Sequence, residues 1–102
     1  MEVRVLYFEG CPNGLRTSEH LREALATISR ADTPVVLTCV EPEEPPPGFA
    51  GSPTILVDGS DLFPGATLAN NRTCRLFPTS EGLAGSPAVG ELVLALRGRI
   101  AG

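Results

Sequence analysis

Residues 3–16, VRVLYFEGCPNGLR, set the architecture of the chain, because two kinds of hydrophobic pattern meet across one short break. VRVLYF alternates at first and then becomes wholly apolar, as in a strand that is buried toward its end. EGCPNG interrupts the run with turn-forming residues. Residues 15–30 then carry apolar side chains at helical spacing, at Leu21, Ala24, Leu25 and Ile28. The stretch therefore predicts a strand that leads into an amphipathic helix.

The middle of the chain predicts two more strands around a proline-rich connection. Residues 35–41, VVLTCVE, are rich in β-branched residues and predict a second buried strand, parallel to the first because a helical crossover joins them. Residues 41–53 hold too many prolines for a strand or a regular helix. Residues 54–58, TILVD, predict a third strand that ends at the turn pair Asp58-Gly59.

The remaining third predicts a fourth strand and a closing helix. Residues 60–73 are too long for a tight hairpin and indicate an exposed excursion, after which residues 74–78, CRLFP, predict the fourth strand. Ser86 and Pro87 are typical of a helix N-cap and first helical residue. One apolar stripe follows, at Val89, Leu92, Val93 and Leu96. We expect a single α/β domain over residues 1–102, with a four-stranded mixed sheet and two helices.

Composition limits the function classes. The chain has 102 residues, 42% of them hydrophobic, and a net charge of −4, which provides no electrostatic footprint for nucleic acid or an anionic membrane. No apolar stretch is long enough to span a bilayer, and Glu2 and Arg4 interrupt the first apolar run, unlike a signal peptide. We therefore expect a cytoplasmic protein that binds neither nucleic acid nor membrane. Composition leaves the oligomeric state open.

Cys11 is the candidate nucleophile. It precedes Pro12, which suits the first helical position, so a helix that begins there makes Cys11 the N-cap. The unpaired N–H groups of a helix N-terminus favour a thiolate, the form of cysteine that attacks disulfides. Thr17 and Ser18 are alternative N-caps, and a helix that began there would leave Cys11 in a loop.

Ser52-Pro53-Thr54 is the second candidate element. It opens the third predicted strand, where a cis Ser52-Pro53 bond would present the Ser52 backbone to an extended thiol substrate. An ordinary trans proline at the start of an edge strand is the alternative. Cys11 is therefore expected to be catalytic, and the expected substrate-binding residues are Pro12, Asn13, Ser52, Pro53 and Thr54.

The stretches FEGCPN, GSPTILVDG, CRLF and GLAGSP resemble those of small bacterial thioredoxin-like proteins, some of which are labelled alkylmercury-lyase-like. The resemblance runs from Val3 to Arg97 and implies a thioredoxin-like fold in which the proline-rich stretch replaces the second helix. It places Cys11 at the attacking thiol and Pro53 at the cis proline. Gly14 stands where a redox enzyme of this fold has its resolving cysteine. The resemblance therefore implies monothiol exchange with a thiol or disulfide substrate, which can itself be a protein, resolved by an external thiol.

The remaining cysteines and the single histidine bear on the alternative functions. Cys39 is expected to be a buried apolar residue, and Cys74, near Arg72 and Arg75, is a possible second thiol for Cys11. His20 is expected on the surface, and no Cys/His spacing indicates a metal site. No resident cofactor is expected; glutathione would be the external thiol, although Glu81 beside Thr79 and Ser80 disfavours its carboxylate. A binding module without catalysis and a soft-metal or mercurial-binding protein remain the alternatives.

Overall fold

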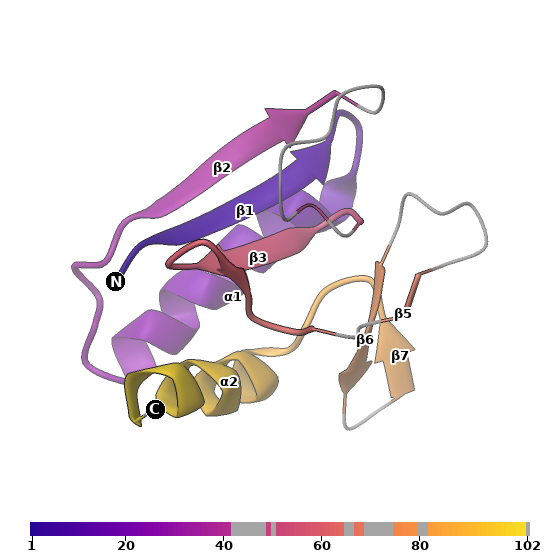
Figure 1. Cartoon of the computed structure of the whole chain (residues 1–102). Helices are drawn as coiled ribbons and strands as arrows, with labels where there is room; N and C mark the ends of the chain where they lie inside the picture. Colours follow the sequence, from indigo (N-terminus) through magenta and orange to yellow (C-terminus); the bar gives the residue numbers. More distant parts are fainter. Residues whose placement is uncertain (42–48, 50, 65–66, 69–74, 80–81, 102) are drawn as a thin grey trace.

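A computed structural model describes residues 1–41, 49, 51–64, 67–68, 75–79 and 82–101. Strands and helices follow in the order β1 (Val3–Phe8), α1 (Pro12–Thr27), β2 (Val35–Val40), β3 (Thr54–Val57), β4 (Ser60–Asp61), β5 (Thr67–Leu68), β6 (Arg75–Thr79), β7 (Gly82–Ala84) and α2 (Val89–Ala101). The described residues form a small α/β structure with two helices, a four-stranded mixed sheet and a second, three-stranded sheet (Figure 1).

The main sheet has the strand order β2-β1-β3-β4. β1 pairs in parallel with β2 along its whole length, from Val3 opposite Val35 to Phe8 opposite Val40. β3 is antiparallel to both β1 and β4. The strand, helix and parallel strand expected from residues 3–41 are therefore confirmed, and so is the mixed character of the sheet.

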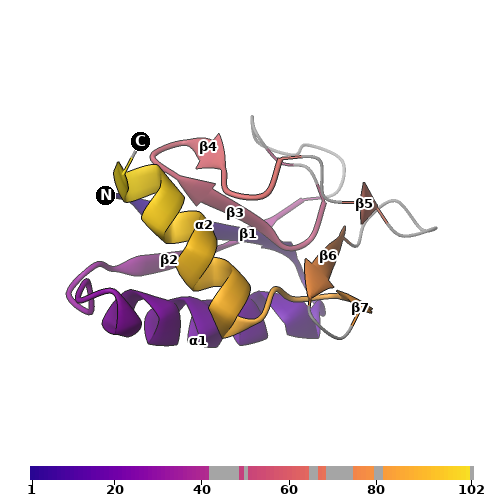
Figure 2. The ribbon, with the colours of Figure 1, turned by 90° about the horizontal axis from the view of Figure 1, so that it is seen from below.

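Both helices cover the same face of this sheet (Figures 1 and 2). The side chains of Val3 and Val5 on β1, and of Ile55 and Val57 on β3, alternate onto this face, as the period of two in a strand requires. They pack against one apolar stripe from each helix, formed by Leu21, Ala24, Leu25, Leu92, Val93 and Leu96. This is the main core, and it fixes α1 across β1 and β2.

The opposite face of the sheet carries a second, smaller cluster. Leu6, Val40 and Leu56 are buried there, and Phe8 and Phe49 pack against them. The rings of Phe8 and Phe49 meet edge to face with centroids 5.1 Å apart. Residues 42–48, most of the proline-rich stretch expected to replace the second helix, lie outside the described residues.

The fourth strand of the main sheet is not the one expected from the sequence. Asp58 and Gly59 have φ values of 52° and 82° and form a tight turn that returns the chain as β4 beside β3. The expectation of an exposed excursion that begins at residue 60 is therefore wrong at its start, since Leu62 is buried in the main core. The expected fourth strand, CRLFP, instead contributes β6 to the second sheet, between β5 and β7.

The end of α1 and the start of α2 differ from those expected. α1 begins at Pro12 and ends at Thr27, not Arg30, because Ser29 takes φ 62°. The N–H groups of Ser29 and Arg30 then bond back to the carbonyls of Ala26 and Leu25, a Schellman termination. α2 begins at Val89, two residues after Pro87, so Ser86 is not its N-cap. Neither helix is long and apolar enough to cross a membrane, as judged over the described residues.

Arg99 fastens the end of α2 to the β3–β4 hairpin. Its Nη1 donates to the Val57 carbonyl at 3.1 Å, and its Nη2 donates to the carbonyls of Ser60 and Asp61. We expect Arg99→Met to lower the free energy of unfolding by about 1–2 kcal/mol, because the alkyl stem is kept while these bonds are lost. Urea denaturation measures this change.

Arg97→Met is the matched control for this prediction. Arg97 is exposed on the same helix, so its replacement is expected to change the free energy of unfolding by less than about 0.5 kcal/mol. Equal unfolding midpoints for the two variants would contradict the fastening role of Arg99.

Candidate functional site

Cys11 is the N-cap of α1. It has extended backbone angles, φ −80° and ψ 113°, and Pro12 follows as a first-turn residue. Its N–H bonds to the Phe8 carbonyl at 3.1 Å, which closes a turn whose left-handed position, φ 84°, is held by Gly10. The helix therefore begins at Pro12 rather than at Thr17 or Ser18, which are both buried within α1. The sulfur makes no capping hydrogen bond, so no such bond has to break before it reacts.

A pocket of about 250 Å³ opens at Cys11. The turn after β1 and the first turn of α1 form most of its wall, and Ser52 completes it from the start of β3; the lining residues are Phe8, Glu9, Gly10, Cys11, Pro12, Asn13 and Ser52. The side chain of Cys11 is half-buried and Pro12 is exposed at the rim. The structure thus brings together four of the expected site residues: Cys11, Pro12, Asn13 and Ser52.

The Ser-Pro-Thr element contributes one residue, Ser52, to the wall of this pocket. The Ser52-Pro53 peptide bond is cis. Ser52 is fully buried, and its hydroxyl accepts the N–H of Phe8 at 3.1 Å, which ties this turn to the end of β1. Pro53 is buried and does not line the pocket. Thr54 is fully buried, and its hydroxyl donates to the Gly51 carbonyl, so it stabilises the turn formed by residues 51–54.

Gly14 is buried against β1, and this contact explains why it is glycine. A Cβ at position 14 would lie 2.7 Å from Cγ and 2.8 Å from Cβ of Tyr7. Real side chains do not approach this closely, and Cβ of Tyr7, which is fixed to the backbone, cannot swing away without moving the strand. Position 14 therefore has no room for a cysteine while Tyr7 holds its place. Sequence reasoning missed this contact because it depends on how closely α1 approaches β1.

Cys39 differs from expectation. It is exposed, not buried, and β2 is an edge strand of the main sheet, with a neighbour on one side only. It lies opposite Tyr7 in the parallel register, at the same end of the sheet as the Cys11 pocket. Cys74, the expected second thiol, lies outside the described residues, and its pairing with Cys11 stays a prediction.

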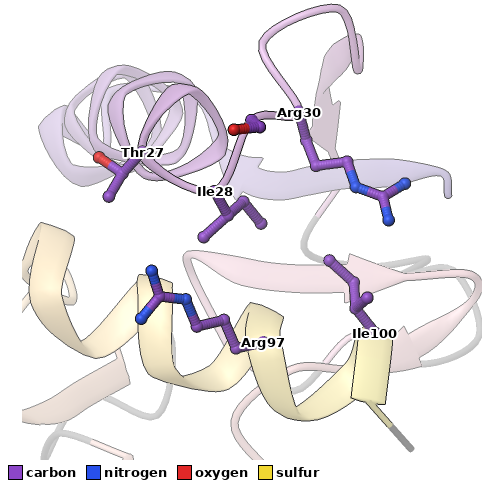
Figure 3. Close-up of a pocket in the computed structure, with 6 residues that line it drawn as sticks. Thr27, Ile28, Arg30, Arg97 and Ile100 are labelled. Atoms are coloured by element: carbon purple, nitrogen blue, oxygen red, sulfur yellow. The ribbon is translucent and has the colours of Figure 1, made fainter.

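A larger pocket lies at the other end of α1. It has a volume of about 440 Å³ between the C-terminal ends of the two helices, and Thr27, Ile28, Ser29, Arg30, Arg97 and Ile100 line it. Figure 3 shows Ile28 and Ile100 between the side chains of Arg30 and Arg97, whose guanidinium groups extend in opposite directions. The two cations therefore do not converge on one position, as the recognition of a single anion would require.

The donor set around Cys11 limits what the pocket can hold. Over the described residues, no group of three or more His, Cys, Asp or Glu side chains lies close enough to hold a metal ion. The thiol of Cys11 is the one strong nucleophile among the residues that line its pocket. No protein-family model, no curated protein and no solved structure matches this chain.

Proposed function

We propose that the protein is a thioredoxin-fold, single-thiol protein that exchanges disulfides through Cys11. The observation that carries this proposal is the position of Cys11, at the N-cap of a 16-residue helix with its sulfur free of capping bonds and beside an open pocket. The N–H groups of the first helical turn have no partners within the helix and favour negative charge at this sulfur. Fold support comes from the parallel β1-α1-β2 unit, followed by an antiparallel β3 that begins at a cis proline.

The exchange conserves electrons and needs no resident cofactor. The Cys11 thiolate attacks one sulfur of a disulfide R–S–S–R, so a Cys11–S–S–R bond forms and RS⁻ leaves. An external thiolate then attacks this mixed disulfide on the sulfur of R, which releases the Cys11 thiolate and a new small disulfide. The tight contact between Gly14 and Tyr7 supports resolution by an external thiol, because it leaves no room for a resolving cysteine at position 14.

Alkylation rates test this proposal. We expect Cys11 to react with iodoacetamide at least about tenfold faster than Cys39 near neutral pH, because its sulfur lies at a helix N-terminus, where the positive end of the dipole favours an anionic transition state. Cys39 is the internal control, since it is the more exposed thiol and lies on a strand. Mass spectrometry of the peptides after timed quenching gives both rates, and urea-unfolded protein should show them equal. Equal rates in the folded protein would contradict the proposal.

A non-catalytic binding module is the second candidate. The excluded side chain at position 14 favours it, because the intramolecular two-thiol cycle cannot run there. The two candidates predict different behaviour for Cys11→Ser. Loss of exchange with a small disulfide supports catalysis, whereas a binding module keeps its partner binding unchanged in this variant.

A further inference from the structure

A second pocket of about 380 Å³ lies beside the Cys11 pocket. It opens between α1 and the chain that joins the second sheet to α2, and its lining residues are Arg16, His20, Thr79, Ala84, Gly85, Ser86 and Ala88. The two pockets share a wall. Asn13 lines the Cys11 pocket, and its side chain lies so close to Gly85 that a Cβ there would be 2.4 Å from Asn13 Nδ2.

Arg16 provides positive charge in this second pocket. It is exposed and makes no hydrogen bond or ion pair with the described residues, and none of the described residues that line the pocket is acidic. Side chains on a helix tilt toward its N-terminus, which is the end of α1 that carries Cys11. Arg16 is five positions after Cys11, which corresponds to about 7.5 Å along the helix axis and about 140° around it. A molecule held at Cys11 therefore has to extend past Asn13, the shared wall, to reach this cation.

His20 provides a fixed hydrogen-bonding group one turn farther along the helix. Its Nδ1 lies 3.0 Å from the Pro87 carbonyl oxygen, and because a carbonyl only accepts, Nδ1 carries the proton. In the neutral ring, Nε2 is then an acceptor. A buried hydrogen bond of 3.0 Å between Thr17 and Ser86 holds the two walls of the pocket together. The ring is thus positioned by the same chain segment that closes the pocket.

We infer that this second pocket binds the carboxylate of the disulfide substrate, with Arg16 pairing the carboxylate and His20 Nε2 accepting from an adjacent N–H group. The inference rests on the proposed function of Cys11. The substrate class is a small disulfide of amino-acid type, whose carboxylate extends from the Cys11 pocket past Asn13 into the second pocket. The net charge of −4 favours cationic over anionic substrates, since the overall electrostatic field attracts cations. A measured preference for anionic disulfides would therefore have to come from a nearby positive charge such as that of Arg16.

Exchange rates with four disulfides of different charge distinguish the effect of Arg16 from that of the net charge. Exchange is measured in Cys39→Ser/Cys74→Ser protein, in which Cys11 is the sole cysteine, with cystine, 3,3′-dithiodipropionate, cystamine and hydroxyethyl disulfide. Each rate is divided by that of free mercaptoethanol with the same disulfide. We expect dithiodipropionate to react about fivefold to tenfold faster than hydroxyethyl disulfide, cystine to react at least as fast as dithiodipropionate, and cystamine to be slowest.

Arg16→Gln and Arg22→Gln form the matched pair. Both remove one positive charge from α1, but Arg22 lines none of the three pockets described above. The anionic preference is expected to disappear in Arg16→Gln and to persist in Arg22→Gln. The same ranking in both variants, or cystamine fastest in the parent, would overturn the inference.

A binding measurement keeps this inference separate from the proposed function. The chain has a single histidine, so the ring signals of His20 in a proton NMR spectrum need no further assignment. In Cys11→Ser/Cys39→Ser/Cys74→Ser protein, dithiodipropionate should shift these signals saturably, and Arg16→Gln should abolish the shift. Saturable binding without exchange in the Cys11 protein would overturn only the proposed function. Exchange at Cys11 without any shift of His20 would overturn only the second pocket.

Discussion

Gly14→Cys is expected to lower the free energy of unfolding by about 2–3 kcal/mol under reducing conditions. The new Cβ would overlap Cγ and Cβ of Tyr7, so α1 must move away from β1 before the side chain fits. This movement loosens the packing of the helix whose N-terminus carries Cys11. A urea titration followed by circular dichroism measures the loss.

Gly98→Cys is the control for this substitution. Gly98 lies in α2, and a Cβ there would meet nothing within 4 Å. The same residue change should leave the free energy of unfolding within about 0.5 kcal/mol of the parent or raise it slightly, because cysteine is a better helix former than glycine. Similar losses at positions 14 and 98 would show that the contact with Tyr7 is not the reason for glycine at position 14.

Phe77→Ala is expected to cost about 3–5 kcal/mol. Phe77 is fully buried although it lies on β6, outside the main sheet. Its ring meets that of Phe63 edge to face with centroids 5.4 Å apart, and Phe63 packs against the main core. The ring therefore connects the second sheet to the rest of the molecule, and the loss should appear in one cooperative unfolding transition.

Leu94→Ala provides the comparison for Phe77→Ala. Leu94 is 73% exposed on α2, so its truncation should change the free energy of unfolding by less than about 0.5 kcal/mol. Two separate transitions in Phe77→Ala, with the far-ultraviolet signal of the helices retained in the second, would instead make the β5-β6-β7 sheet an independent unit.

The hydrophobic pattern of the sequence was sufficient to predict the strands and helices that bury one apolar face. The apolar run before Cys11, the stripe around Leu21 and Leu25 and the stripe around Leu92 and Leu96 each report the side that packs inward, and all three lie in the main core. The parallel pairing of β1 with β2 followed from their order around a helix. Pro12 after Cys11 marked the first helical turn correctly.

The hydrophobic pattern failed to predict features that depend on which strands pair with one another. β4 has two residues, too few to show any period, and residues 74–78 indicate a strand without saying which sheet receives it. Cys39 lies in an apolar run that is typical of a buried strand, yet its exposure depends on β2 being an edge. Tertiary pairing determines both, and no local signal contains it.

The candidate site was predictable in part for the same reason. Cys11, Pro12 and Asn13 are contiguous, so their shared pocket wall follows from one turn. The contact between Asn13 and Gly85 joins residues that are far apart in the chain and required the fold. Arg16 and His20 carried a usable signal, because residues four apart lie on the same face of a helix, but nothing local showed that a pocket covers that face.

The hairpin turn at Asp58 has a consequence for protein engineering. Asp58 accepts the N–H of Glu2 through its carboxylate, at 2.8 Å, and Arg99 bonds to Val57 beside it, so residues near both ends of the chain contact this hairpin. The Cys11 pocket lies past the other end of β1, about 20 Å away for six residues of strand. An affinity tag or fluorophore at either terminus therefore leaves the pocket clear.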